Sequence, residues 1–359
     1  MVVPEPTELR GTLAKSDGKI AREDFEGAAA PGRHKRSTAV RPHQLLALAL
    51  VSWTVGGCAA DSTETPGASP TVDLLVFAPH PDDEALGCAG IVRQALTAGR
   101  RVKVAIFTNG DGFPGFAALL AKKPEDRLGP GDYLELARYR QNQSQAAFRA
   151  LGGDPEDLVF LGYPDSGLDQ VVLTRGSTPY QQKFTGKTET YGAARRDYHS
   201  VAQGRAAPYT YASALADVVA LIRSFNPGRI CVTSPADRHR DHQAAFRLVK
   251  DGVEASGYAG ALQTYLIHGG PEWPWPLGIA PESRFEAHEV KGERIPLGVP
   301  WPPPQRVALS AEECRFKLDA IRAHATHLTA TSDGPMAQER AYLESFVKSE
   351  EVFWTVERP

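Results

Sequence analysis

Short apolar segments alternate with segments of helical periodicity along the chain from Val72 to about residue 267. The first of them, VDLLVFA, is apolar apart from Asp73, which is typical of a parallel strand that is covered on both faces. Strands that alternate with helices in this way indicate βαβ units. We therefore predict an α/β fold, a Rossmann-like open and mainly parallel sheet with helices on both faces. The expected strands cover 72–78, 102–108, 158–161, 229–233 and 262–267, and the expected helices cover 84–99, 132–151, 211–225 and 241–256.

The composition excludes several classes of protein. The 359 residues include 40 Lys and Arg against 43 Asp and Glu, which gives a net charge of −3. A dedicated nucleic-acid-binding protein would instead show a basic stripe and a high pI, so we expect no nucleic-acid partner. No stretch of the sequence approaches the roughly 18 apolar residues that a membrane-spanning helix needs, which excludes a multi-pass membrane protein.

The N-terminal segment differs from the rest and has the composition of a delivery signal. Residues 1–57 join a polar extension, which we predict to be disordered, to a basic segment (RHKR, 33–36) and an apolar run (45–55). A basic flank, a short apolar run and small residues before a cleavage point are typical of a secretory signal. The Val-Gly-Gly that precedes Cys58 also resembles a bacterial lipobox, and residues 58–71 then form a polar tether.

This pattern predicts a lipid on Cys58, which would be the only attachment to a membrane, and an extracytoplasmic location. Such signals usually stand at the very start of a chain, so either translation begins later than Met1 or the extension is genuine. Two alternatives stay open. The apolar run could be a buried helix beside a chance cysteine, or the protein could be cytoplasmic.

Residues 72–359 are expected to form a single domain that two long insertions interrupt. The insertion at about 170–210 is polar and bears tyrosines, and the one at 269–304 is rich in Pro and Trp. Loops of this length tend to be functional or disordered. Their aromatic rings either stack on the faces of a sugar or pack beneath the loops. Beyond the second insertion we expect helices over 310–324 and 335–347.

A histidine and three consecutive acids follow the first expected strand directly: His80, Asp82, Asp83 and Glu84. In an open α/β sheet, ligands bind beyond the carboxyl ends of the strands, where this cluster lies. Adjacent carboxylates repel one another unless a cation lies among them. The start of a helix also favours negative charge, so a simple helix cap is the alternative. We predict a metal site.

A second cluster, His239, Asp241 and His242, follows the expected strand at 229–233. Two histidines three residues apart at a helix start can face the same way, and Asp241 could orient one of them. Imidazole and carboxylate suit a divalent metal such as zinc, and three protein ligands with an open position define a catalytic site. The alternative is an exposed, charged loop.

The remaining potential ligands have no comparable context. We expect His268 to be a satisfied histidine at a strand end, and His324 and His327 to be surface or packing residues. The cysteines other than Cys58 are odd in number and lack the paired spacing of a zinc cluster or a disulfide framework. We assign no chemistry to Cys88, Cys231 and Cys314.

The two clusters, HPDDE at 80–84 and H-x-D-H at 239–242, together resemble the paired signature of the PIG-L/LmbE-like zinc-dependent N-deacetylases. The resemblance runs from about residue 72 to residue 267 and is weaker near 309–321. It implies a general base, Asp82, and an acid, His239, with Asp241 behind that acid. The zinc ligands that it implies are His80, Asp83 and His242.

The resemblance also implies two substrate-binding residues, Arg140 and Asp165. Arg140 stands where the family usually has an Arg at the start of a helix, and Asp165 follows the third expected strand. The chain departs from the pattern twice. Gln143 replaces the acid usually found three residues after the Arg, and Asp237 stands where some members have a Tyr.

Taken together, these residues predict a zinc hydrolase that removes the N-acetyl group of a GlcNAc-like amino sugar or its conjugate. The products would be acetate and a free amine. The alternatives are a zinc hydrolase of another amide or ester and a non-catalytic carbohydrate-binding lipoprotein. Binding alone would require neither Asp82 nor His239, which favours the enzyme.

Overall fold

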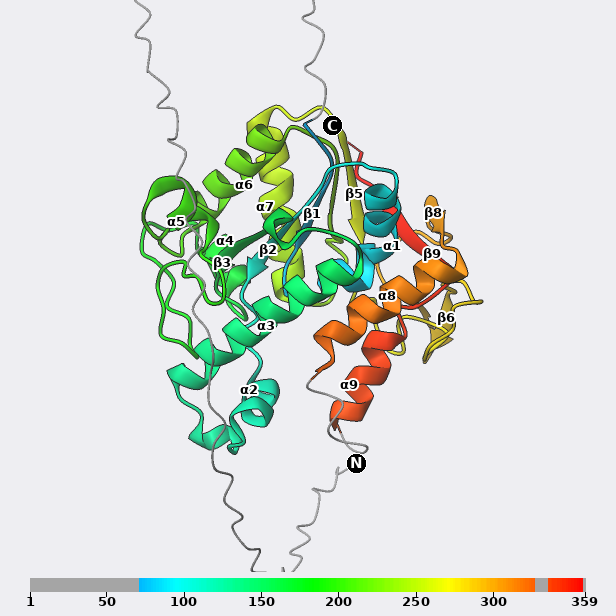
Figure 1. Ribbon diagram of the computed structural model, residues 1–359, viewed down its shortest axis with the longest axis horizontal. Coiled ribbons are helices and arrows are strands. Elements are labelled where there is room, and N and C mark those ends of the chain that lie inside the picture. Colours follow the sequence, from blue (N-terminus) through cyan, green and yellow to red (C-terminus); the bar gives the residue numbers. More distant parts are fainter. Residues whose placement is uncertain (1–70, 327–334, 358–359) are drawn as a thin grey trace, which may run out of the picture. The chain divides into compact units, whose positions relative to one another are not determined.

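A computed structural model describes residues 71–326 and 335–357 (Figure 1). The predicted signal segment, Cys58 and His327 lie outside the described residues, as does the tether apart from Thr71. In the described part of the chain, no helix combines the length and the apolar character that crossing a membrane requires.

A seven-stranded sheet runs through the molecule in the order β3-β2-β1-β4-β5-β9-β8. Neighbouring strands from β3 to β5 are parallel. At one edge β9 pairs antiparallel with β5, and β8 pairs antiparallel with β9. The chain moves outward from β1 to β3 and then returns to β4 on the other side of β1, so the direction of winding reverses between β1 and β4. The strands are β1 Val72–Ala78, β2 Val102–Thr108, β3 Leu158–Tyr163, β4 Pro227–Thr233, β5 Ala261–Tyr265, β8 Gln305–Ala308 and β9 Glu350–Thr355.

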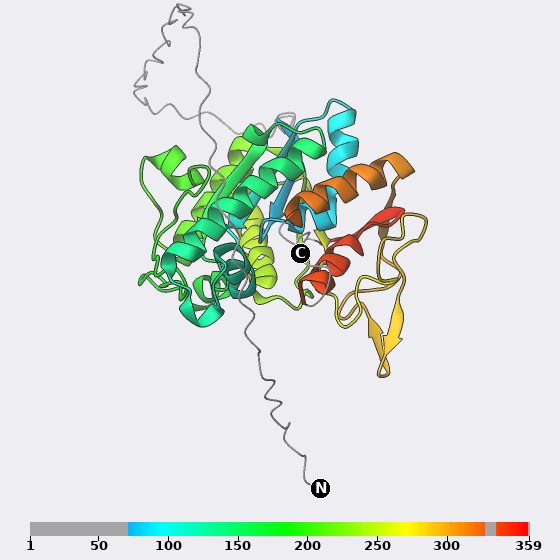
Figure 2. The same cartoon turned by 60° about the horizontal axis from the view of Figure 1, so that its bottom comes forward.

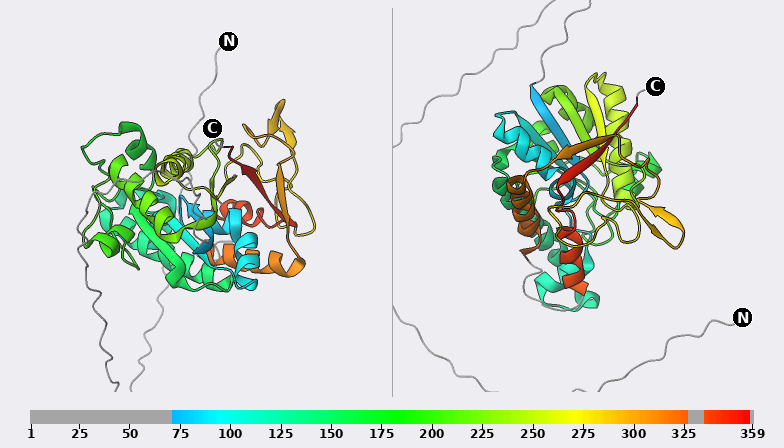
Figure 3. Two further views of the ribbon diagram at one scale, coloured as in Figure 1. Left: turned by 90° about the horizontal axis from the view of Figure 1, so that it is seen from above. Right: turned by 90° about the vertical axis from the view of Figure 1, so that its right-hand side faces the viewer.

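Helices cover both faces of this sheet (Figures 2 and 3). The core on one face contains residues of α1, α3 and α8, and the core on the other contains residues of α4, α6 and α7. In the right-hand view of Figure 3, α1 and α8 lie on one side of the strands and α7 on the other. The helices are α1 Asp83–Thr97, α2 Pro114–Ala121, α3 Pro130–Ala150, α4 Leu168–Thr174, α5 Tyr198–Gln203, α6 Tyr211–Phe225, α7 Arg240–Ser256, α8 Ala311–His324 and α9 Pro335–Glu344.

The side chains of β1 explain why its sequence is continuously apolar from Leu74 to Ala78. Successive side chains of a strand point to opposite faces of the sheet. Leu74 and Val76 enter the core beneath α1 and α3, whereas Leu75 and Phe77 enter the core beneath α6 and α7. Both faces are covered from Leu74 onward, so no position there favours a polar residue, and the one acid of the strand, Asp73, is exposed near its start. The prediction of a mainly parallel, doubly covered sheet is confirmed.

The elements that the sequence did not predict lie mostly in the C-terminal third. The last strand, β9, begins with two acids, Glu350 and Glu351, and so does not have the pattern of an apolar strand. Both acids are buried with partners, and Glu351 accepts hydrogen bonds from Lys317 and from the backbone of α1. The insertion at 269–304 contains a hairpin of β6 (His288–Val290) and β7 (Glu293–Ile295).

Two glycines let α1 lie close to the sheet. A Cβ atom at Gly87 would approach the ring of Tyr265 to 2.2 Å, and one at Gly90 would approach Leu309 to 2.4 Å. Real side chains do not make contacts this short, so Gly87 requires glycine beside the ring of Tyr265, whereas at Gly90 the end of the Leu309 side chain would have to move. Because α1 is held here, its first turn, which begins at Asp83, is fixed at the carboxyl end of β1.

Candidate metal centre and active site

The two sequence clusters meet where the winding of the sheet reverses. The first follows β1 and opens α1, and the second lies between β4 and α7. Because β1 and β4 are parallel neighbours, their carboxyl ends lie side by side. Ligands in open α/β sheets bind at such a reversal. The two segments therefore share one site, although His80 and His242 lie 162 residues apart in the chain.

Three donor atoms converge at this point, from His80, Asp83 and His242. Oδ2 of Asp83 lies 3.3 Å from Nδ1 of His80 and 3.2 Å from Nε2 of His242, and the two nitrogens are 3.1 Å apart. All three side chains are buried. A tetrahedral zinc ion with bonds of about 2.0–2.1 Å places its ligand atoms roughly 3.3–3.4 Å apart. We call these residues the donor triad, and their spacing and chemistry fit a divalent metal.

Buried carboxylates surround the donor triad and favour positive charge within it. Oδ2 of Asp237 lies 3.1 Å from Nδ1 of His242, so the imidazole of His242 is held between two acids. Burial lowers the pKa of His242, but Asp83 and Asp237 raise it to about 9. Asp237 also accepts the backbone N–H groups of Ile267 and His268. A carboxylate behind a metal-binding histidine fixes the orientation of its ring.

Asp165 and Asp241 occupy the corresponding position behind His80. Nε2 of His80 lies 3.4 Å from Oδ1 of Asp165 and 3.5 Å from Oδ2 of Asp241. Burial lowers the pKa of His80, but these carboxylates, Asp165 foremost, raise it well above its usual value. Asp241 was predicted to stand behind His239, but its carboxylate faces His80 and accepts the backbone N–H groups of Ser166 and Asp169. Asp165 likewise lies behind a donor as well as lining the pocket.

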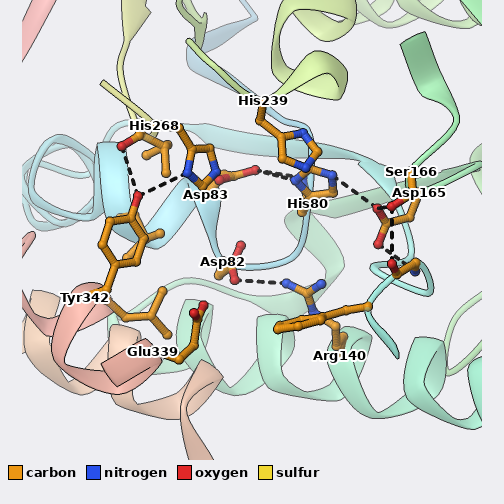
Figure 4. A pocket seen from close by; sticks show the side chains of 15 residues that line it. His80, Asp82, Asp83, Arg140, Asp165, Ser166, His239, His268, Glu339 and Tyr342 are labelled. Atoms are coloured by element: carbon orange, nitrogen blue, oxygen red, sulfur yellow. Dashed lines mark hydrogen bonds and ion pairs between the residues drawn. The ribbon is translucent and has the colours of Figure 1, made fainter. Parts of the chain in front are cut away.

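Asp82, the predicted base, is held in an unusual backbone conformation. Its φ of 137° lies in a region that residues other than glycine rarely adopt. The backbone N–H of Asp82 donates to Oε2 of Glu84, and Nη2 of Arg140 binds Oδ2 of Asp82 at 2.9 Å. Nη2 of Arg140 also donates to the carbonyl of Pro81 at 2.6 Å. These contacts aim the carboxylate of Asp82 into the pocket (Figure 4).

The ionisation of Asp82 reflects the same surroundings. Burial raises the pKa of Asp82 to about 6, while the positive charge of Arg140 opposes the rise. Arg140 was predicted to contact substrate, and it does line the pocket, but its guanidinium is already engaged with the predicted base. Gln143, at the position of the missing acid, points elsewhere and donates to the carbonyl of His324.

Glu84 connects the predicted base to the C-terminal helices. Its Oε1 lies 2.9 Å from Nε2 of His324, the last residue of α8, and both side chains are buried. Since Oε2 of Glu84 accepts the N–H of Asp82, one carboxylate bridges α8 and the strained residue. His324 was expected at the surface or in packing, and it packs at the base of the site. The sequence carries no signal for a pair of residues that lie 240 positions apart.

His239 lies across the opening from Asp82 and caps α7. Its Nδ1 accepts the backbone N–H of Asp241 at 3.3 Å, which leaves the proton of a neutral ring on Nε2. Ring nitrogens of His239, His80 and His242 lie within 4.8 Å of one another. Burial lowers the pKa of His239 to about 4, and positive charge on His80 and His242 adds to that effect. At pH 7 this imidazole is therefore neutral.

A cavity of about 280 Å³ opens above these groups, and a helix from the C-terminal part of the chain forms one side of it. We call the residues of α9 that line it, Glu339, Tyr342 and Leu343, the C-terminal wall. The hydroxyl of Tyr342 lies 3.3 Å from Nδ1 of His268 and 3.1 Å from the carbonyl of Ile267 (Figure 4). His268 was expected at a strand end, but β5 ends at Tyr265, and His268 lies in the loop beyond it and lines the pocket.

The aromatic residues of the insertions pack rather than line this cavity. Trp273 is buried against Phe285, and Trp275 stacks on His288 with ring centroids 4.8 Å apart. Tyr209 of the first insertion is buried too, and its hydroxyl donates to the carbonyl of Gly162. Of the two interpretations of these rings, packing beneath the loops is the one that the structure supports.

The molecule is therefore an α/β protein with a candidate metal centre where the winding of its sheet reverses. Imidazole and carboxylate donors form this centre, and Asp82 and His239 lie beside it. The family comparison agrees with that class. Residues 75–253 match the family model described as PIG-L: GlcNAc-PI de-N-acetylase. Residues 75–253 are thus a PIG-L family domain, and the resemblance noted in the sequence is confirmed. His268, His324 and the C-terminal wall lie beyond the matched residues.

Solved structures with a similar fold include three proteins. The conserved protein TT1542 from Thermus thermophilus is 22% identical, with 80% of this chain and 97% of that chain covered and a TM-score of 0.43. N,N'-diacetylchitobiose deacetylase from Pyrococcus horikoshii is 17% identical, with 82% and 86% covered and a TM-score of 0.48. The A40926 pseudoaglycone deacetylase Dbv21 is 18% identical, with 80% and 98% covered and a TM-score of 0.45. No curated protein matches the chain.

Proposed function

We propose that this protein is a zinc-dependent hydrolase that removes the N-acetyl group from a GlcNAc-like amino sugar or its conjugate. One observation carries the proposal. The donor triad places two imidazole nitrogens and a carboxylate oxygen 3.1–3.3 Å apart, and Asp82 and His239 line the cavity beside it. The description of the matched family, a de-N-acetylase, supports the same reaction.

The donor set favours zinc among the common divalent metals. Two imidazoles and one carboxylate are ligands of catalytic zinc sites, in which the remaining position is open to water or substrate. The residues that would hold the ion are His80, Asp83 and His242, and Asp237, Asp165 and Asp241 would orient the histidines. When bound there, zinc supplies a Lewis acid and lowers the pKa of a bound water.

Asp82 is the proton acceptor for the attacking water. With a pKa of about 6 its carboxylate is ionised at pH 7, yet it is basic enough to take a proton. Its backbone conformation and its contact with Arg140 direct the carboxylate toward the pocket. A base that is already held in place loses no rotational freedom when the reaction takes place.

His239 serves the other side of the amide. Because Nδ1 accepts the N–H of Asp241, the Nε2–H of the neutral ring is free to donate a hydrogen bond to the oxygen of the amide as charge develops on it. The nitrogen of the leaving amine needs a proton, because it is too poor a leaving group to depart as an anion. Asp82 supplies the proton that it took from the water, and His239 stays neutral and holds the oxygen through its Nε2–H.

The substrate class rests on the family description and on the size of the site. A cavity of about 280 Å³ is at the lower end for ligand pockets, which suits one sugar ring rather than a long glycan. We also propose that Cys58 carries a lipid and that the enzyme works outside the cytoplasm. In that location an N-acetylated sugar of the cell surface or the surroundings is the substrate, rather than an intracellular precursor.

The direct test is acetate release by the purified protein from a panel of N-acetyl sugars, scored together with the appearance of a free amine. We expect hydrolysis with zinc present, loss of activity after chelation, and recovery when zinc is restored. Hydrolysis of acetate esters without hydrolysis of N-acetyl sugars would favour the alternative reaction. Binding of sugars without any acetate release at saturating zinc would contradict the proposal.

The location has its own test. Radiolabelled palmitate given to cells that express the full chain should label the protein and carry it into the membrane fraction, and Cys58→Ala should abolish both. A wild-type protein that stays unlabelled and in the soluble cytoplasmic fraction would contradict the lipid anchor.

A further inference from the structure

One acidic side chain of the pocket lacks a partner among the described residues. Glu339 lies on the C-terminal wall, and Figure 4 shows its carboxylate pointing toward Asp82. No residue in the described part of the chain makes a hydrogen bond or an ion pair with this carboxylate. By contrast, other acids of the pocket, including Asp82, Asp83 and Asp165, have charged or backbone partners within 3.5 Å.

A half-buried carboxylate loses part of its hydration, and without a partner in the described part of the chain nothing replaces what it loses. Burial raises the pKa of Glu339, and the positive charge of Arg140 offsets only part of that rise. Arg140 itself is engaged with Asp82 and with the carbonyl of Pro81. A side chain in this state is suited to a ligand that brings its own hydrogen-bond donors.

The balance of charge in the cavity indicates which ligands those are. Four acids line it (Asp82, Asp83, Asp165 and Glu339), whereas Arg140 is the one described lining residue with a permanent positive charge. A divalent ion at the donor triad would offset two of the four negative charges. The side of the cavity near Glu339 therefore repels a phosphate or a carboxylate and attracts hydroxyl and ammonium groups.

We propose that Glu339 is a specificity-determining residue that binds a hydroxyl or amino substituent of the substrate, and that it selects neutral or amine-bearing sugars against sugars that carry an acidic group there. This proposal rests on the proposed function and adds the substrate class. Glu339 lies outside residues 75–253, so the selection is a property of this chain's own C-terminal helix and not of the matched segment.

The first experiment measures kcat and KM on three probes, using the full chain loaded with zinc. The neutral probe is N-acetylglucosamine. The two acidic probes are N-acetylglucosamine 6-phosphate and N-acetylmuramic acid, which carry their acidic groups at different positions of the sugar. Wild type should prefer the neutral sugar. In Glu339→Gln we expect KM for the neutral sugar to rise about tenfold, the size expected for a hydrogen bond to a charged group, with kcat nearly unchanged. Preference over the acidic probes should fall by a similar factor.

The control is Glu293→Gln, which removes an exposed acid on β7 and should match wild type on all probes. A Glu339→Gln variant with unchanged KM and unchanged preference would overturn the proposal. So would a large fall in kcat at constant KM, because that result would make Glu339 a proton-transfer group rather than a binding group.

A second measurement does not depend on turnover. Binding of glucosamine, the free-amine sugar, is measured by titration calorimetry in wild type, Glu339→Gln and Glu293→Gln. We expect about tenfold weaker binding in Glu339→Gln alone. Equal affinity in all three proteins, or no binding to any of them, overturns the role of Glu339. Acetate release tests the proposed deacetylase function separately, so that function and the role of Glu339 can be refuted independently.

Discussion

The two sides of the candidate site are built by different means. The donor triad comes from two short segments that follow β1 and β4, and the parallel pairing of those strands brings the segments together. The C-terminal wall comes from α9, which follows α8 in the chain and lies outside the matched family segment. Local motifs at strand ends thus place the candidate reacting groups, and tertiary packing places the C-terminal wall.

The test with the largest expected effect changes only the side of the site that holds the donor triad and Asp82. Asp82→Asn removes the proton acceptor but keeps the shape and leaves the donor triad intact. We expect kcat to fall by about 10²–10⁴-fold, the contribution typical of general-base catalysis. Acetate release under saturating substrate measures the change, and zinc content should stay at the wild-type level. Wild-type activity in Asp82→Asn would remove Asp82 from the mechanism.

The second test separates positioning from reaction. His324→Ala breaks the pair with Glu84, whose other oxygen holds the N–H of Asp82. Because a base that is misplaced by a fraction of an ångström loses efficiency, we expect kcat to fall roughly tenfold with KM unchanged. Glu84→Gln keeps an oxygen for Asp82 and should lose less activity than Glu84→Ala.

The matched control for that test is His199→Ala. His199 is also paired with a buried acid, Asp217, at 2.7 Å, but the pair lies outside the pocket lining. It should lose stability in denaturant unfolding without a selective loss of kcat. If His199→Ala and His324→Ala lower kcat equally, the pair of His324 with Glu84 has only a general structural role.

The third test uses pH. Asp82 acts only when it is ionised, so kcat/KM should fall as the pH drops through about 6, the pKa of that carboxyl. Arg140 lowers this pKa, so Arg140→Gln should move the acidic limb upward, by about one pH unit or more. If Arg140 instead contacts the substrate alone, as the sequence predicts, KM rises and the limb stays in place. The pH profiles of kcat/KM for the two proteins decide between these results.

The two sides of the site also differ in how much of each can be predicted from the sequence. The apolar run of β1 and the alternation of elements predict the sheet, and acids and histidines at two strand ends predict a metal site without any knowledge of distant packing, while the choice of the three ligands comes from the family resemblance. The roles of carboxylates are harder to predict. Asp241 is adjacent to His242 in sequence, yet the turn of α7 aims its carboxylate at His80. Spacing identifies which residues gather but not which atom faces which.

The C-terminal side could not be predicted for a different reason. Glu84 and His324 meet only because α8 packs against α1 and α3, and Glu339 reaches the cavity only because α9 lies beside α8. Neither His324 nor Glu339 has neighbours in sequence that suggest a site. The strand that anchors this region, β9, begins with two buried acids and therefore lacks an apolar signature.

The central claim is that His80, Asp83 and His242 hold one divalent ion, and metal content tests it most directly. Wild type, Asp82→Asn and His242→Ala are dialysed against limiting zinc and analysed by inductively coupled plasma mass spectrometry. We expect about one zinc per chain in wild type and Asp82→Asn, and little or none in His242→Ala, since two remaining donors bind far more weakly. A full zinc equivalent in His242→Ala, at wild-type affinity, would contradict the account.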